Sequence, residues 1–117
     1  MIIKSDSDVK EIVLEEEGVK NVRKQVLIGT EDGSDNIIMR RFLIFSGGNT
    51  PFHKHPHEHV VRVEKGRGLA VNEEGKEMLI GKGSCLFIKG GEKHQFRNPF
   101  SEPFGFLCII LNQIKNT

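Results

Sequence analysis

Hydrophobic and polar positions along most of the chain follow a short period that glycine- and proline-rich turns interrupt. From residue 22 onward, runs rich in β-branched and aromatic residues alternate with turn segments. No amphipathic segment of helical period and comparable length competes with these runs. Turns at this spacing predict an all-β sandwich or barrel, and 117 residues leave room for one domain. The predicted strands are 22–29, 37–45, 60–63, 69–72, 77–80, 84–88, 94–98 and 104–111.

The first 21 residues have a weaker pattern, with an acidic cluster at 15–17. We expect residues 1–21 to form an arm or a first strand ahead of a barrel at 22–117. Exchange of this segment between the subunits of a dimer is one option.

Two predicted strands, 84–88 and 104–111, are apolar at successive positions. A strand with one wet face alternates, so continuous apolarity indicates that both faces are covered. In so small a domain one cover is the barrel interior and the other is a second subunit. We therefore expect a homodimer, with a tighter monomeric sandwich as the alternative.

Composition and charge limit the kinds of partner and the location that are expected for the protein. The 17 basic residues are scattered and balanced by 16 acidic ones, which argues against nucleic acid. No apolar run approaches the roughly 18 residues of a membrane span, and the N-terminus lacks the apolar stretch of a secretory signal, so a cytoplasmic protein is expected. Cys85 and Cys108 lie in apolar runs without a CxxC pair and are expected to be reduced and buried.

The segment HKHPHEH, residues 53–59, places four histidines at every second position. On a straight strand the outer two would stand roughly 20 Å apart, whereas metal–nitrogen bonds are about 2.0–2.1 Å. Neighbouring His53 and His55 can converge on one ion, but a third ligand needs a bend. Pro56 supplies that bend because its φ is fixed and it has no N–H to donate.

The strand after the bend decides which histidine returns. Alternation puts His59 on an apolar face with Val61 and Val63, and it puts Glu58 on the charged face with Arg62 and Glu64. We therefore expect His59, rather than Glu58, to be the third ligand. His57 falls in the turn and is expected to point outward, near the mouth of the site.

His94 is the remaining histidine, and it shares one face of its strand with Phe96 and Asn98. A histidine on an apolar face is often an ordinary core residue, and a histidine cluster can be incidental. Four neutral imidazoles in one core would each need hydrogen-bond partners, however, and one metal accepts a lone pair from each. A metal site with His53, His55, His59 and His94 is therefore the simpler interpretation.

These residues resemble the two conserved motifs of the cupin superfamily. The first motif matches at Gly47, His53, His55, His59 and Gly66, with His59 where the motif has glutamate. The second matches at Gly83, Gly90, Gly91, His94 and Asn98, with Lys89 where the motif has proline. The resemblance implies a jelly-roll barrel. Asn98 is expected to be a structural turn residue rather than a catalyst.

A narrower resemblance, to small four-histidine cupins of thermophilic bacteria, covers most of the chain. It implies a homodimer with one divalent metal per subunit on His53, His55, His59 and His94. Manganese is favoured, with Fe, Ni, Cu, Co or Zn as alternatives. The same resemblance implies a substrate pocket lined by Arg40, Phe106 and Cys108; an ordinary core role for Phe106 and a surface role for Arg40 are the alternatives.

Three functions are compatible with these features. The leading interpretation is a metal-dependent dioxygenase that acts on a small apolar or enol-type molecule, since four ligands leave an octahedral ion two open positions. The alternatives are a non-catalytic module that binds a small molecule or metal, and a metal-dependent isomerase or epimerase. No catalytic side chain beyond the metal ligands can be named, although Glu58 and His57 are expected near the mouth.

Overall fold

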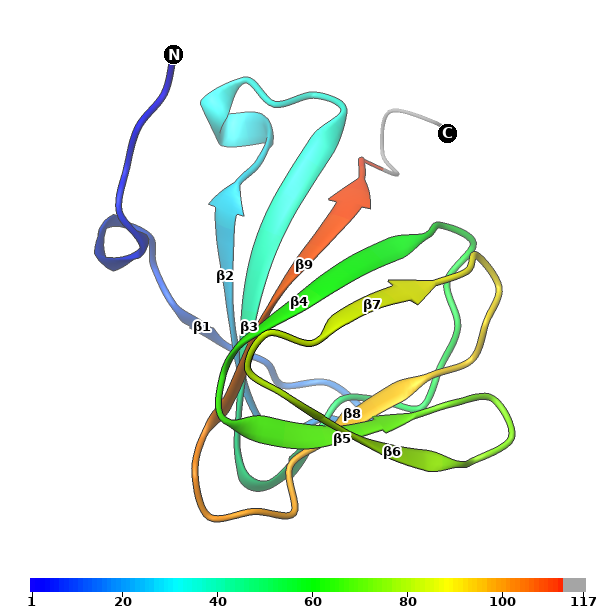
Figure 1. Cartoon of the computed structure of the whole chain (residues 1–117). Helices are drawn as coiled ribbons and strands as arrows, with labels where there is room; N and C mark the ends of the chain where they lie inside the picture. Colours follow the sequence, from blue (N-terminus) through cyan, green and yellow to red (C-terminus); the bar gives the residue numbers. More distant parts are fainter. Residues whose placement is uncertain (113–117) are drawn as a thin grey trace.

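The chain folds into a curled sheet that forms a jelly-roll half-barrel in the computed structural model, which describes residues 1–112 (Figure 1). The all-β prediction is confirmed. The elements of the described chain are η1 (Asp6–Asp8), β1 (Ile12–Val13), β2 (Lys20–Ile28), η2 (Thr30–Asp32), β3 (Ile37–Asn49), β4 (His59–Lys65), β5 (Arg67–Val71), β6 (Glu77–Gly81), β7 (Cys85–Ile88), β8 (Gln95–Arg97) and β9 (Phe104–Leu111).

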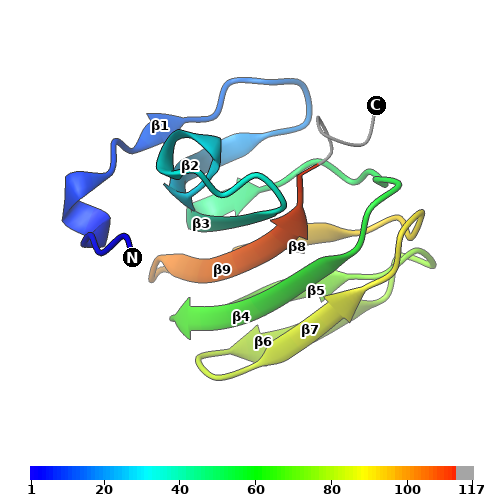
Figure 2. The ribbon, with the colours of Figure 1, turned by 90° about the horizontal axis from the view of Figure 1, so that it is seen from above.

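The strands pair antiparallel in the order β6-β5-β8-β3-β9-β4-β7. The long strand β3 also pairs with β2, which in turn pairs with β1. Figure 1 shows β4 and β7 on one side of the curl and β5, β6 and β8 on the other, and Figure 2 shows the same strands from above. Segments distant in the sequence, such as β3 and β9, thereby become direct neighbours.

The core lies inside this curl and follows the alternation of the strands. On β4, His59, Val61 and Val63 are 4%, 1% and 1% exposed, whereas Val60 between them is 52% exposed. On β9, Phe104 is fully buried. The expected inward face of the strand after Pro56 is therefore confirmed.

One predicted boundary is wrong: β3 does not end at residue 45 but continues to Asn49. Its glycines form an irregularity within the strand, where the pairing with β2 shifts between Lys20 and Val22. Gly47 adopts a left-handed φ of 78°, and a Cβ on Gly48 would come 2.6 Å from the Lys20 carbonyl oxygen. Glycine here bends a continuing strand instead of ending it.

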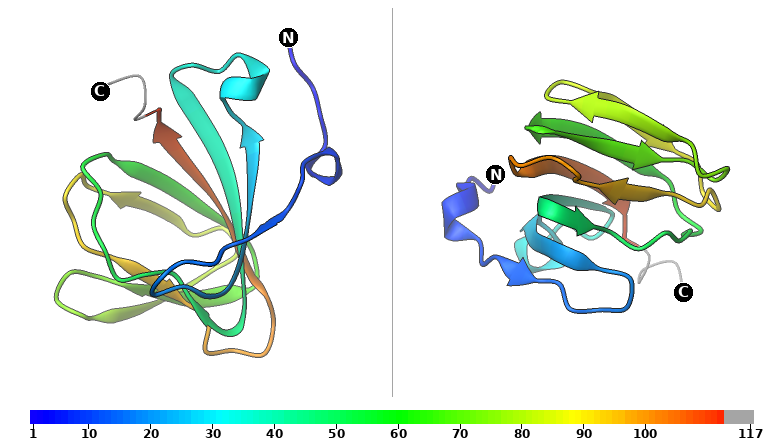
Figure 3. Two further views of the ribbon diagram at one scale, coloured as in Figure 1. Left: turned by 180° about the vertical axis from the view of Figure 1, so that it is seen from behind. Right: turned by 90° about the horizontal axis from the view of Figure 1, so that it is seen from below.

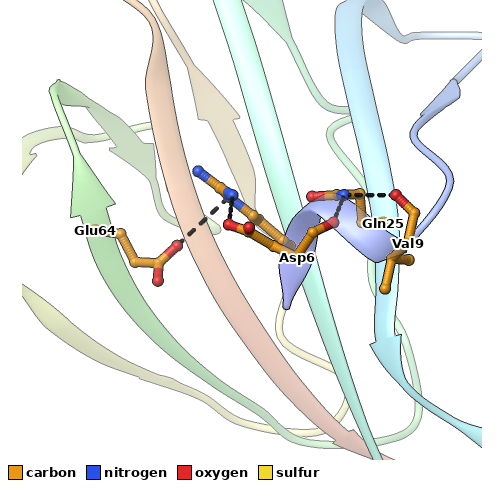
Figure 4. Close-up of polar contacts among 5 residues, drawn as sticks. Asp6, Val9, Gln25 and Glu64 are labelled. Carbon is orange, nitrogen blue, oxygen red and sulfur yellow. Dashed lines mark hydrogen bonds and ion pairs between the residues drawn. The ribbon is translucent and has the colours of Figure 1, made fainter. Parts of the chain in front are cut away.

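The N-terminal segment runs along the outer side of β2, as Figure 3 shows from two further directions. The Gln25 side chain is 8% exposed and donates to the carbonyl oxygens of Asp6 and Val9, both at 2.9 Å (Figure 4). Arg41 on β3 pairs with Asp6 at 2.6 Å and with Glu64 at 3.5 Å. These contacts fasten η1 to its own chain, and exchange of residues 1–21 within a dimer stays a prediction.

The outer face of β4, β7 and β9 is open and partly apolar within one chain. Val60 pairs with Phe87 on one side and Ile109 on the other, and Phe87 is 59% exposed. Cys85 lies on this open face, so the expectation that both cysteines are buried is wrong for Cys85 and right for Cys108. β7 is the last strand of the sheet order, and its odd positions face outward. The homodimer that would cover this face stays a prediction.

Residues 113–117, the end of the predicted 22–117 barrel, lie outside the described residues. Among residues 1–112, no helix has the length and apolarity needed to cross a bilayer. A cytoplasmic location stays a prediction.

Candidate metal centre

The histidines meet where the segment between β3 and β4 passes the start of β8. The backbones of His53 and His94 pair as an isolated bridge, with each N–H donating to the other carbonyl at 3.1 and 3.0 Å. The chain then bends at Pro56 and enters β4 at His59, as the sequence predicts. Two segments far apart in the sequence are thus held side by side by main-chain hydrogen bonds.

Three of the four predicted ligands form a compact group. One ring nitrogen from each of His53, His55 and His94 lies within 4.8 Å of the other two. Two nitrogens on one ion are at most about 4.2 Å apart, so little movement would bring all three onto a metal. His59 lies outside this group, but its ring centroid is 5.1 Å from that of His55 and 5.2 Å from that of His94. It is therefore placed beside the cluster as the candidate fourth ligand.

His57 does not point away from the cluster, contrary to the sequence-based expectation. Its ring stacks on His55 with centroids 5.0 Å apart and planes at 17°, and it lies 4.7 Å from the His59 ring. Its Nδ1 is buried and has no hydrogen-bond partner among the described residues. A cavity, described below, opens beside the cluster, and neither His57 nor the exposed Glu58 lines it. His57 therefore packs behind His55 and His59 rather than at the mouth of the site.

The donor set fits a divalent metal. His94 Nδ1 donates to the Glu92 carbonyl oxygen at 2.9 Å, which leaves Nε2 with a free lone pair for an ion. His59 Nδ1 is buried and has no hydrogen-bond partner in the described chain, a cost that a bound ion or water near this ring would reduce. Desolvated neutral imidazoles are the form that metals bind.

The turn before His94 is formed despite Lys89 in the place of the motif's proline. The Glu92 N–H donates to the Lys89 carbonyl, and the Glu92 carboxylate accepts from the Lys89 N–H at 3.1 Å. A Cβ on Gly90 would come 2.4 Å from the Pro56 carbonyl oxygen. Glycine at position 90 therefore allows this turn to lie directly against the histidine segment.

The environment of His53, His55 and His59 disfavours the charged form of their imidazoles. Burial lowers the pKa of His55 to about 4 and that of His59 to about 3, and the charges of neighbouring histidines and Arg40 add to the effect. Burial is also the main cause that lowers the pKa of His53, and the charge of the neighbouring His94 adds to this effect. His55 and His59 are thus neutral and able to ligate well below neutral pH.

These shifts predict acid sensitivity of the metal-free protein. Its free energy of unfolding should fall by roughly 2 kcal/mol between pH 6.5 and pH 5. Most of this interval lies above the pKa values of ordinary carboxyl groups, so the change reports mainly on histidines. Histidines in the unfolded chain take up protons near a pKa of about 6.5. Folded His55 stays neutral in this interval, so acid favours the unfolded chain. The partial exposure of the histidine rings to solvent reduces the size of the effect. Urea unfolding with EDTA measures this slope. H55Q should flatten it, and equal stability of the wild type at both pH values would contradict the prediction.

A cavity of about 150 Å³ opens beside the histidines. His53, His55, His59 and His94 line it, and so do Arg40, Phe106 and Cys108, the side chains that the resemblance places in the pocket. The other lining residues, which the sequence did not single out, are Leu14, Glu16, Lys24, Phe42, Thr50, Pro51 and Phe96. A space of this volume holds a molecule of about the size of benzene.

Two of these additional residues carry charge. Lys24 shares the inward face of β2 with the fully buried Val22, while its neighbours Arg23 and Gln25 face the other way. A lysine on an otherwise apolar face is the signal that could have identified Lys24. Glu16 comes from the arm at 14–19, and no period in the sequence predicts where that arm crosses the cavity.

Arg40 and Cys108 interact on the cavity wall. The Arg40 Nη2 donates to the Cys108 sulfur at 3.1 Å, and the guanidinium carbon lies 5.0 Å from the centroid of the Phe42 ring. Burial raises the pKa of the Cys108 thiol although Arg40 opposes the shift. Cys108 is therefore held as a neutral thiol at neutral pH.

Comparison with known proteins matches residues 41–110 to the family described as cupin domain. The curated 1-methylthio-D-xylulose 5-phosphate methylsulfurylase of Rhodospirillum rubrum is 32% identical over 91 residues, or 78% of this chain; this chain spans only 56% of that protein. The solved polyketide cyclase RemF of Streptomyces resistomycificus is 31% identical with a TM-score of 0.90, covering 95% of this chain and 79% of that one.

A solved cupin-2 domain from Rhodospirillum rubrum is 29% identical with a TM-score of 0.81, and the superposition covers 94% of this chain and 74% of that one. These superpositions extend over almost the whole chain, including the N-terminal part that the family match leaves out. The family match itself covers more than half of the chain, and the chain therefore belongs to the cupin domain family.

Proposed function

We propose that this cupin is a divalent-metal-dependent enzyme that acts on a small molecule with a carbonyl or enol group. The observation that carries the proposal is that the histidine cluster shares one cavity wall with Lys24 and Arg40. His53, His55 and His94 would hold the ion, with His59 as the fourth ligand. When bound, the ion would supply Lewis-acid polarisation of a substrate oxygen.

The chain's own residues complete this chemistry. Phe96 and Phe106 are 6% and 2% exposed and keep water from one side of the cavity. Lys24 and Arg40 place positive charge on the wall beside the substrate, which lowers the cost of the negative charge that the substrate gains during enolisation. Glu16 is the one carboxylate on this cavity wall within residues 1–112, and it is our candidate for the group that moves a proton.

The relatives support carbonyl chemistry without naming the reaction. One is named for a xylulose phosphate and another for cyclising a polyketide, and both compounds contain ketone groups. The cavity is too small to enclose either compound fully, so only the reacting end would enter. A dioxygenase is the second candidate, and the phenyl rings of Phe42, Phe96 and Phe106 on the cavity wall favour it. The preference for manganese comes from the four-histidine resemblance alone.

The test is to purify the protein without added metal, determine its metal content, and reload it with Mn, Fe, Co, Ni, Cu or Zn. Hydrogen–deuterium exchange at C3 of 2-oxobutanoate, followed by NMR without oxygen, reports enolisation. Oxygen uptake with pentane-2,4-dione and styrene reports the dioxygenase. We expect metal-dependent exchange that H55A lacks. Oxygen uptake without exchange would favour the dioxygenase, and inactivity with every metal in both assays would leave a non-catalytic binding module.

A further inference from the structure

Two cations face the cavity from adjacent strands and lack a full counter-charge. In the pairing of β2 with β3, Lys24 lies opposite Phe42 and Val26 opposite Arg40, so Lys24 and Arg40 are diagonal neighbours on the inward face. Diagonal neighbours are about 7–8 Å apart at the backbone, within reach of two long side chains. Both line the cavity that holds the histidines.

Neither cation forms a salt bridge with any residue of the described chain. Burial lowers the pKa of Lys24, and the charge of Arg40 lowers it further, while Glu16 opposes them less strongly. The Arg40 Nε is buried and has no hydrogen-bond partner in the described part of the chain. Like charges in a partly buried site are unfavourable, and a buried donor without an acceptor adds to this cost.

A bound oxyanion would remove both costs, because a carboxylate or phosphate accepts charge-assisted hydrogen bonds from lysine and arginine. Arg40 is also close enough to the histidine cluster for its charge to lower the pKa values of His55 and His59. One small molecule could therefore offer its anionic group to the two cations while its carbonyl group faces the histidines.

We propose that Lys24 and Arg40 form an oxyanion-binding pair and that the substrate is a small carbonyl compound with a carboxylate or phosphate group. This inference rests on the proposed function in treating the cavity as the substrate site, and it adds the charge of the substrate. Glu16 lies on the same wall and repels the anion, so its removal has an effect opposite in sign to removal of either cation.

The experiment is calorimetric titration of metal-free protein, kept in EDTA, with 2-oxobutanoate, its neutral analogue 2-oxobutanamide, and inorganic phosphate. The acid or phosphate should bind and the amide should not. K24M and R40M should each weaken anion binding at least about tenfold. K24R keeps the positive charge and should stay within about threefold of the wild type, whereas R40K keeps the charge but loses the planar guanidinium beside Phe42 and should lie between the wild type and R40M.

E16Q should bind the anion about two- to fivefold more tightly. The matched control is R23M, since Arg23 lies next to Lys24 on the outer face and pairs with Glu11; it should bind within about twofold of the wild type. Binding of carboxylate alone or phosphate alone identifies the anionic group and supports the pair. Equal binding of the amide, or wild-type affinity in either K24M or R40M, overturns the proposal.

This measurement is independent of the proposed enzymatic function because it uses neither metal nor turnover. If the protein binds anions through Lys24 and Arg40 but shows no metal-dependent exchange, the oxyanion-binding pair is supported and the proposed enzymatic function is contradicted. If the protein turns over 2-oxobutanoate but K24M and R40M bind it with wild-type affinity, the enzymatic function is supported and the oxyanion-binding pair is contradicted.

Discussion

Alanine at position 55 should lower divalent-metal affinity by two orders of magnitude or more. The His55 ring lies 4.2 Å from His53, 5.9 Å from His94 and 5.1 Å from His59, so it is close to every other candidate ligand, a position that it shares with His94. Losing one of three or four imidazoles removes a metal–nitrogen bond, and loss of a mere supporting contact already costs about 10- to 100-fold in many sites. Competition with a chromophoric chelator measures the affinity directly.

The remaining histidines provide a graded control. H53A and H94A should resemble H55A, because their ring nitrogens complete the compact group. H59A should weaken binding less than these if His59 is only the fourth ligand. H57A should change affinity less than about tenfold, since within the described chain the His57 ring only stacks on His55, forms no hydrogen bond to a candidate ligand and does not line the cavity. A loss in H57A as large as in H55A would show that the ligands have been assigned wrongly.

The parts of this site that follow from local geometry could be predicted from the sequence. Side chains alternate along any strand, so the inward orientation of His59 beside Val61 followed from the apolar pattern after Pro56. Phe106 and Cys108 also line the cavity, but it was the family resemblance, rather than the alternation, that assigned them to the pocket. The histidine spacing likewise indicated a turn between the second and third candidate ligands.

The features that depend on chain path and register could not be predicted in this way. Lys24 and Arg40 become neighbours only through the pairing of β2 with β3, and Glu16 reaches the cavity only because the arm crosses it. The continuation of β3 through Gly47 and Gly48 was missed because glycine signals a turn more often than an irregularity inside a strand. His57 was misplaced because stacking on His55 has no sequence signature.

Asn98 is the other position where a substitution should have a large effect, in this case on the stability of the fold rather than on metal affinity. Its side chain is 1% exposed and makes three hydrogen bonds: Nδ2 donates to the carbonyls of Ile44 and Glu102 at 2.9 and 2.8 Å, and Oδ1 accepts from the Phe100 N–H at 2.9 Å. The amide thus ties β3 to the loop that leads from β8 into β9. This is the structural role that the sequence predicts for Asn98.

N98A should lower the free energy of unfolding by about 3–5 kcal/mol, because it leaves buried backbone groups without partners and a small cavity beside them. N98D separates the two causes, since it preserves the volume but turns the donor to Ile44 and Glu102 into an acceptor. We expect N98D to be at least as unstable as N98A in urea unfolding at pH 7. Near wild-type stability of N98D would mean that packing, rather than these hydrogen bonds, holds the loop. Metal affinity of the folded fraction should change little in both variants, because Asn98 lies outside the cavity wall and its bonds reach β3 and the loop before β9 rather than the histidines.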